Sequence, residues 1–127
     1  MKPFTGNIIE IAKANSNYRK EVATVTGSQV VVMSIPPNDD VGEEVHHDVD
    51  QTLLFVAGTG KTVLNGEEGL IEMGTMAVVP RGTRHNFINM GEGDLKIVTV
   101  YAPPHHKVGT VHATKADAEA DTEDHYE

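Results

Sequence analysis

The stretch GTMAVVPRGTRHNFIN, residues 74–89, contains two short apolar segments joined by a turn. The apolar residues 76–79 predict a buried strand. Pro80 and Gly82 suit a tight turn, because proline fixes φ and glycine accepts a positive φ. A second strand begins near His85, and alternation puts every second residue from there on one face. We therefore expect His85 to point into the space that a sheet encloses.

Six other short runs have the same texture, β-branched or apolar and closed by Gly, Pro, Asn or Asp. They are EVATVTG (21–27), SQVVVMSIPP (28–37), QTLLFVAG (51–58), GKTVLNG (60–66), EEGLIEMG (67–74) and DLKIVTVYAPP (94–104). Eight strands at this spacing indicate an all-β sandwich or barrel. Asn65-Gly66 is a strong signal for a two-residue hairpin.

Short helices are predicted at both ends of this β region. NIIEIAKA (7–14) has apolar residues at helical spacing. TKADAEAD (114–121) reads as a helix with Thr114 as its N-cap and Asp117 at the capping-box position. We find no internal repeat and no linker, so we expect one domain over residues 1–127, with the barrel at about 18–104.

Composition narrows the class of function. The chain has 127 residues, no Cys and a formal charge of −9, so disulfides, thiolate zinc sites and nucleic-acid binding are disfavoured. The start has no apolar run typical of a signal peptide or membrane anchor, and we expect a cytoplasmic protein without membrane contact. Six acids against one Lys lie in residues 115–127; we interpret the region from about residue 112 to 127 as a solvated acidic tail.

Two motifs carry a family resemblance. Gly74, Pro80, Gly82, His85 and Asn89 have the spacing G-x5-P-x-G-x2-H-x3-N, which matches the second motif of the cupin superfamily at all five positions. EVHHDVDQTLLFVAG (44–58) is similar to the first motif, G-x5-H-x-H-x3-4-E-x6-G. Most of the chain resembles small bacterial cupins, often labelled mannose-6-phosphate isomerase-like. The resemblance implies a jelly-roll barrel, the double-stranded β-helix, and a homodimer.

The resemblance also implies one divalent metal ion inside the barrel. Position by position, its ligands would be Glu44, His46, Gln51 and His85. Glu44 stands where cupins have the first His, and Gln51 stands where they have the acid. Such donors suit Mn, Fe, Ni, Co or Zn. A smaller set without Gln51 has two His and one carboxylate, as in non-haem Fe(II) oxygenases.

Alternation separates these residues from their neighbours. Glu44 and His46 share one face of an extended segment, which leaves His47 on the outer face. We expect His112 and His125 at the surface, and the pair His105-His106 in a loop where it could bind metal only adventitiously. Inward-facing residues are candidates to line a substrate pocket: Met33, Leu53, Phe55, Phe87 and Tyr101.

These features support two functions. The first is a small metalloenzyme for a small polar organic substrate, of the sugar-derivative isomerase or non-haem dioxygenase type, with Glu44 as a group that transfers protons. The second is a non-catalytic module that binds or senses a small ligand, with a structural metal or none. A third, weaker alternative is a partner-binding protein that uses its acidic tail.

Overall fold

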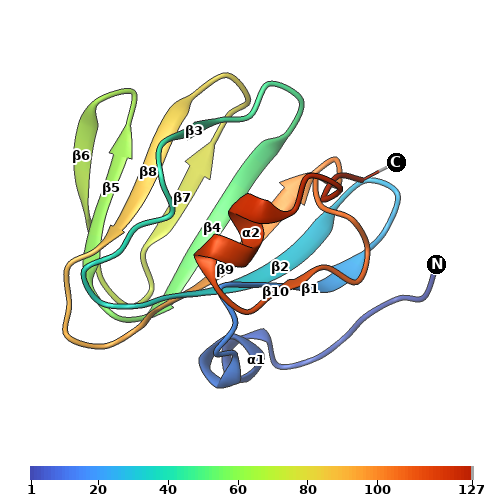
Figure 1. Cartoon of the computed structure of the whole chain (residues 1–127), viewed down its shortest axis with the longest axis horizontal. Coiled ribbons are helices and arrows are strands. Elements are labelled where there is room, and N and C mark those ends of the chain that lie inside the picture. The colour runs from blue at the N-terminus through green and yellow to red at the C-terminus, as the bar shows by residue number, and fades with distance from the viewer. Residues whose placement is uncertain (127) are drawn as a thin grey trace.

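The computed structural model describes residues 1–126 and consists of two antiparallel β-sheets that face each other (Figure 1). Glu127, the last acid of the predicted tail, lies outside the described residues. The strands are β1 Arg19–Thr24, β2 Gln29–Ile35, β3 Glu44–Val45, β4 Asp50–Ala57, β5 Gly60–Leu64, β6 Glu67–Ile71, β7 Met76–Val79, β8 Arg84–Asn89, β9 Leu95–Ala102 and β10 Val111–His112. The all-β jelly-roll fold is thereby confirmed, with all eight predicted strands present.

The sheets differ in size. The larger has the order β10-β1-β2-β9-β4-β7 and the smaller has the order β3-β8-β5-β6. Two strands of two residues each, β3 and β10, were not predicted, and each extends the edge of a sheet. The β5–β6 hairpin turns at Asn65 and Gly66, whose φ angles of 49° and 83° are both positive, as an Asn-Gly turn requires.

The central strands of the larger sheet, β2, β4 and β9, carry apolar residues on both faces. In β2, Val31 and Met33 belong to the cluster between the sheets, whereas Val32 belongs to a second cluster on the outer face. The helix α1 (Ile8–Ala14) covers that outer face, where its Ala12 is fully buried. Alternate residues of the strand therefore contribute to two hydrophobic cores, and α1 shields the outer core from water.

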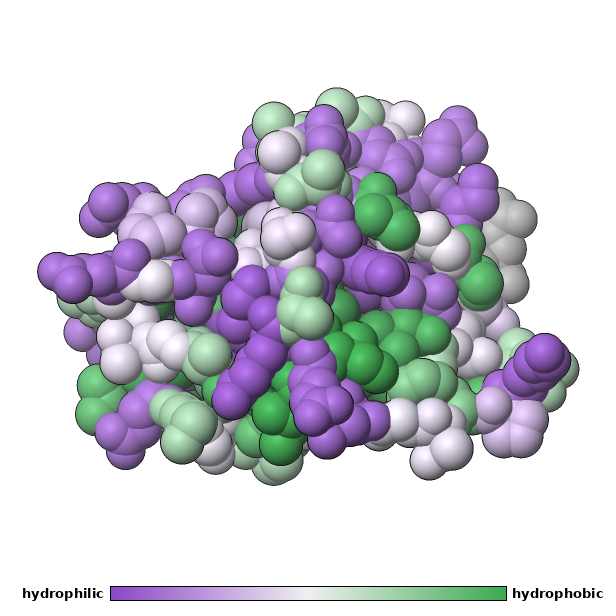
Figure 2. All heavy atoms as spheres, turned by 90° about the horizontal axis from the view of Figure 1, so that it is seen from below, coloured by the Kyte–Doolittle hydropathy of each residue, from purple (hydrophilic) through white to green (hydrophobic). Residues whose placement is uncertain are grey.

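Both predicted helices are present and capped. In α2 (Lys115–Ala120) the Thr114 hydroxyl accepts a hydrogen bond from the Asp117 amide at 3.1 Å, as predicted. The α1 side of the molecule shows hydrophobic side chains near its centre (Figure 2). In the N-terminal region that includes α1, Phe4 and Ile9 are about half exposed. Neither helix within residues 1–126 has the length and apolar character needed to cross a membrane.

Candidate metal site at the barrel mouth

The turn predicted at Pro80 positions both halves of the site. Gly82 has a φ of 84°, and its amide donates to the His46 carbonyl at 2.7 Å. Strand β8 follows, and β3 pairs with it so that Glu44 lies opposite His85. The turn thus holds the segment with Glu44 and His46 against the strand with His85, although these residues are about forty positions apart in the chain.

His85 is buried and oriented. It is 2% exposed, while Arg84 beside it is exposed, as alternation predicts. Its Nδ1 lies 2.9 Å from the Thr83 carbonyl. Because a carbonyl only accepts hydrogen bonds, Nδ1 carries a hydrogen, which leaves Nε2 as the nitrogen of this ring that could bind a metal. A backbone contact of this kind orients histidines that bind metals.

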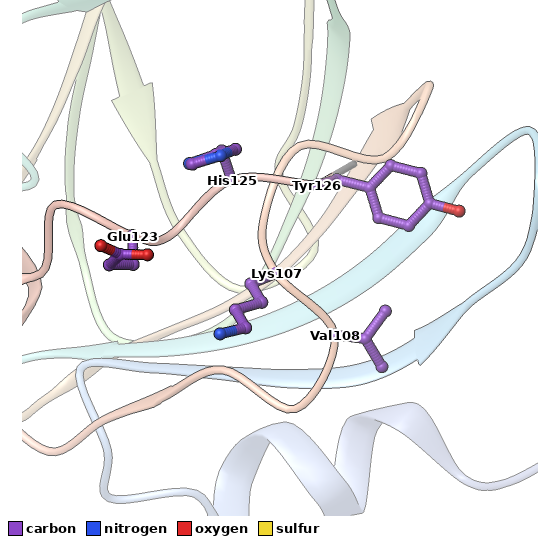
Figure 3. A pocket seen from close by; sticks show the side chains of 5 residues that line it. All are labelled: Lys107, Val108, Glu123, His125 and Tyr126. Carbon is purple, nitrogen blue, oxygen red and sulfur yellow. The ribbon is translucent and has the colours of Figure 1, made fainter.

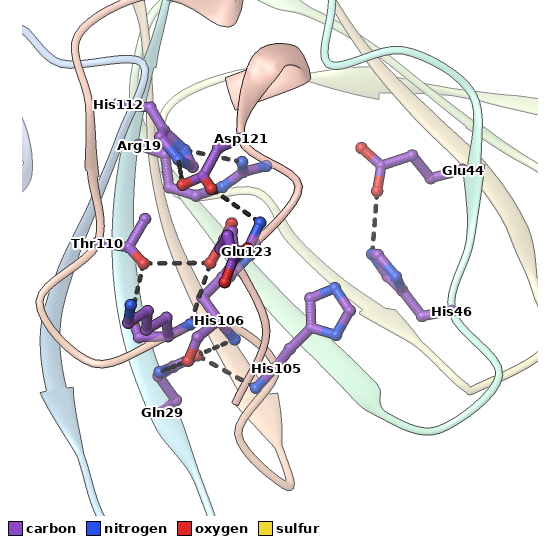
Figure 4. A network of polar contacts seen from close by, with 12 residues as sticks. Arg19, Gln29, Glu44, His46, His105, His106, Thr110, His112, Asp121 and Glu123 are labelled. Atoms are coloured by element: carbon purple, nitrogen blue, oxygen red, sulfur yellow. Dashed lines mark hydrogen bonds and ion pairs between the residues drawn. The ribbon is translucent and has the colours of Figure 1, made fainter. Parts of the chain in front are cut away.

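Glu44 and His46 face the same side, as predicted, and His47 is exposed. His46 Nε2 lies 3.3 Å from Glu44 Oε2 (Figure 4). Burial lowers the pKa of His46 to about 3, helped by His105 and other nearby imidazoles, so its ring is neutral at pH 7. Burial raises the pKa of Glu44, against the field of Arg19. The pair therefore presents a neutral imidazole beside a carboxyl group whose proton is held more firmly than usual.

Gln51 is 4% exposed on β4. Its Nε2 donates to Thr99 Oγ1 at 3.0 Å, whereas its Oε1 is buried and has no hydrogen-bond partner among residues 1–126. A buried acceptor without a partner is costly, so such an atom calls for an explanation. A bound cation is a suitable partner for an amide oxygen.

The chemical types of these donor atoms fit a divalent cation, but in this structure the side chains do not point at one common position. Within residues 1–126, no group of three or more His, Cys, Asp or Glu side chains is arranged to hold a metal ion. The rings of His46 and His85 have their centres 5.1 Å apart. Glu44, His46, Gln51 and His85 would hold the ion, as neutral imidazoles, a carboxylate and an amide oxygen are ligands for first-row metals.

One residue of this cluster lies outside both motifs. The ring centre of His105 is 4.5 Å from that of His46 and 5.3 Å from that of Tyr101. The sequence places His105 in an unrelated loop, because nothing in its spacing links it to residue 46. The adjacent histidines at 105 and 106, after two prolines, are the only signal that the sequence offers.

The predicted pocket residues face the interior, where they fill it. Met33, Leu53 and Phe55 are at most 1% exposed and pack in the core between the sheets. Phe87 and Tyr101 also belong to that core, and their rings contact His85 and His46, respectively, with centres 5.6 and 6.1 Å apart. Contact of any of the five with a substrate stays a prediction.

An open cavity of about 400 Å³ lies at the mouth instead. Glu44 and His105 form part of its wall, together with Arg19 and Lys115. The rest of the wall comes from Tyr18, residues 41–43 before β3, His106 and the C-terminal region, including Asp121 and Asp124. The cavity is therefore polar, and Glu44 is the candidate metal ligand on its wall.

The C-terminal region docks on the barrel, which corrects two expectations. His112 is buried rather than at the surface, with Nε2 3.0 Å from Asp121 and Nδ1 3.4 Å from Arg19 (Figure 4). Asp124 is not fully solvated, because its side chain is only 8% exposed and lies 2.7 Å from His106 Nδ1. Two buried histidines thus anchor a segment that the charge pattern assigned to solvent.

A second hollow, of about 290 Å³, lies beside this docked segment (Figure 3). Its lining consists of Lys107, Val108, Glu123, His125 and Tyr126. None of the predicted ligands is among them.

Comparison with known proteins agrees with the fold and the motifs. The chain is 42% identical over 126 residues to the uncharacterised protein YrkC of Bacillus subtilis, covering 94% of this chain and 67% of the relative. Its fold matches the crystal structure of BH2720 from Bacillus halodurans with a TM-score of 0.93, at 36% identity over 94% of this chain and 96% of that one. KdgF from Halomonas sp. matches with a TM-score of 0.64 at 25% identity, over 67% of this chain and 76% of that one.

The family model described as "Cupin domain" matches residues 31–101, which contain both motifs and the predicted ligands. This match spans more than half of the chain and includes β2 through most of β9. The chain belongs to the cupin family.

Proposed function

We propose that this cupin is a metalloenzyme that holds one divalent cation at the mouth of its barrel. The carrying observation is that His46 and His85, from different motifs, bring their ring centres within 5.1 Å of each other. Gln51 supports it with an amide oxygen that is buried and unpaired among residues 1–126. The ligands are His46, His85 and Glu44, with Gln51 as a fourth, and the ion is one of Mn, Fe, Ni, Co or Zn.

Glu44 is the group of this site that transfers protons. The bound cation would supply Lewis acidity or oxygen activation. Glu44 lies on the cavity wall with its side chain 35% exposed, so a substrate can reach it. When it releases the cation, Glu44 is a better proton acceptor than a solvated carboxylate, because burial raises its pKa. Gln51 cannot share this task, since an amide does not act as a base at neutral pH.

The cavity favours a small polar organic substrate. Its volume of about 400 Å³ lies in the range of small-molecule sites. Arg19 and Lys115 on its wall can pair with oxygen atoms of a substrate, and acidic side chains can accept from hydroxyl groups. Isomerisation of a sugar derivative and oxygenation by a non-haem metal are the two reaction types that this combination supports.

A second candidate is a non-catalytic cupin that binds or senses a small ligand. It is favoured by the amide at position 51, which removes one possible base, and by the filled interior, which leaves only the mouth for a ligand. In this case the ion is structural or absent.

Metal analysis followed by activity assays separates the two candidates. The metal content of protein expressed without a tag in metal-replete medium is measured by elemental mass spectrometry. We expect about one ion per chain in the wild type, a loss in His85→Ala, and no change in the matched control His47→Ala, whose residue is exposed. Metal-loaded protein is then assayed for aldose–ketose isomerisation and oxygen uptake. A wild type that takes up none of the five metals contradicts the enzyme proposal.

We also propose that the chain forms a homodimer. β7 is an edge strand of the larger sheet, and its Met76 and Val78 are about 60% exposed. An uncovered apolar edge favours pairing with a second copy. Light scattering coupled to gel filtration tests this, and a monomer at all concentrations contradicts it.

A further inference from the structure

His105 lies beside His46, with the centres of the two rings 4.5 Å apart. It follows β9 and Pro103-Pro104, outside both motifs. Its ring is turned toward His46, with an interplanar angle of 61° (Figure 4). It also forms part of the cavity wall with Glu44. A substrate in this cavity would therefore meet His105 together with Glu44.

The backbone around His105 is fixed by a buried side chain. Gln29, which is fully buried, accepts hydrogen bonds through Oε1 from the amides of His105 and His106, at 3.2 and 2.8 Å. Its Nε2 donates to the His106 carbonyl at 2.8 Å. In addition, the Tyr126 amide donates to the His105 carbonyl at 3.1 Å. These hydrogen bonds hold the main chain under the His105 ring in place and lower the entropy lost when the ring binds a ligand.

The separations of His46 from His85 and of His46 from His105 agree with a shared ion. Imidazoles bound through nitrogen at about 2.1 Å from one metal, at angles between about 90° and 109°, have ring centres roughly 4.5–5.2 Å apart. The observed values are 4.5 Å for His46 with His105 and 5.1 Å for His46 with His85. His46 is the middle ring of the three, and its Nε2 currently contacts Glu44. A cation would compete with this contact for both side chains.

We propose that His105 is a ligand of the same cation as His46 and His85. The inference rests on the proposed function, because it requires that the site binds a metal. The resulting set has three imidazoles and the carboxylate of Glu44, and it leaves Gln51 as an outer partner. Imidazole suits Fe, Ni, Cu and Zn, whereas carboxylate and carbonyl oxygens suit Mg, Ca and Mn. The site is thereby assigned to the nitrogen-preferring ions.

Cobalt binding tests this ligand directly. Wild type, His105→Ala and the control His47→Ala are freed of metal and titrated with Co²⁺ by calorimetry and visible absorption. We expect the affinity of His105→Ala to fall at least about tenfold, since even outer partners of metal ligands contribute about 10–100-fold. His47→Ala should stay within about twofold of the wild type. Pulsed electron paramagnetic resonance with Cu²⁺ should count three imidazole nitrogens in the wild type and two in His105→Ala.

The outcomes separate the inference from the proposed function. If wild type and His105→Ala bind Co²⁺ equally well, or if the nitrogen count stays the same, His105 is no ligand although the site is real. If the wild type binds none of Co²⁺, Ni²⁺, Zn²⁺ and Fe²⁺, both ideas are wrong. Thermal unfolding with a chelator checks the fold of each variant. If His105→Ala does not fold, His105→Asn decides, because the contacts with Gln29 are made by the main chain.

Discussion

Gln51 donates its amide hydrogen to Thr99 and thereby leaves its own Oε1 buried with no partner among residues 1–126. The contact spans 3.0 Å between neighbouring strands β4 and β9. The hydrogen bond to Thr99 fixes the orientation of the Gln51 amide, so that its oxygen and not its nitrogen lacks a partner. In the first cupin motif, residue 51 would be an acid. Replacing Gln51 by Glu therefore tests what the amide changes.

We predict that Gln51→Glu lowers the stability of the metal-free protein and increases the stabilisation that a bound metal provides. A carboxylate at a site that is 4% exposed lacks a cation to pair with, which costs about 2–3 kcal/mol of unfolding free energy at pH 7. An added divalent cation would supply that charge. Thermal unfolding with chelator and with Co²⁺ should therefore show a larger metal-induced shift in Gln51→Glu than in the wild type.

Thr99→Val is the matched control for this prediction. It removes the hydroxyl partner of Gln51 and adds no charge, so it should destabilise the chain by about 1 kcal/mol and leave the metal-induced shift nearly as in the wild type. Equal shifts in the wild type and Gln51→Glu would show that position 51 does not face the cation.

Asp124 should anchor the C-terminal segment. Its carboxylate accepts hydrogen bonds from the Lys107 amide, the Thr110 hydroxyl and His106 Nδ1, at 3.0, 3.1 and 2.7 Å. We predict that Asp124→Ala lowers the unfolding free energy by about 2–3 kcal/mol, because the variant leaves the buried His106 Nδ1 without its partner and removes two further hydrogen bonds. The exposed Glu119 on α2 provides the control, and Glu119→Ala should change the unfolding free energy by less than about 0.5 kcal/mol. Urea unfolding measures both, and equal effects would mean that the segment is not anchored by Asp124.

His106 should make the stability depend on pH. Burial lowers the pKa of His106 to about 4, against the opposing contact with Asp124. The unfolded chain, with an ordinary histidine pKa near about 6.5, takes up a proton between about pH 6.5 and pH 4, while the folded chain does not. Stability from this group is therefore complete above about pH 6.5 and is lost as the pH falls to about 4, by about 1.4 kcal/mol per pH unit.

Unfolding free energies measured in chelator from about pH 7 to about pH 4.5 test this. The slope should be shallower in His106→Gln than in the wild type, and His47→Gln, which alters an exposed residue, should keep the wild-type slope. The prediction fails if His106→Gln and the wild type lose stability in parallel.

The elements that sequence predicts well here are those with local causes. The β5–β6 turn follows from the Asn65-Gly66 pair, and the start of α2 follows from Thr114, because each signal lies within four residues of its effect. The same holds for the outward His47. The strands β3 and β10 have two residues each, too few for a periodic pattern.

The missed parts of the site depend on contacts between distant residues. Arg19 meets His112 across 93 positions, and His106 meets Asp124 across 18. His105 reaches His46 because β9 ends at the mouth of the barrel, a place that only the pairing of the strands determines. Charge pattern alone assigns the last residues to solvent, since it contains no information about the buried histidines with which they pair.

Gly60 should be the glycine that least tolerates a side chain, since the backbone of β8 lies directly against it. A Cβ atom at this position would overlap the Ile88 carbonyl oxygen, which is backbone and cannot rotate away. Gly60→Ala must therefore push β5 and β8 apart where Gly60 pairs with Asn89. We predict that the unfolding free energy falls by about 2–3 kcal/mol. A methyl group at Gly27 would meet no atom within 4 Å, and the φ of Gly27 is not positive, so Gly27→Ala should cost under about 0.5 kcal/mol. Because β8 also carries His85, the metal affinity of Gly60→Ala should fall together with its stability, and a stable variant with full affinity would refute the close approach of the two strands.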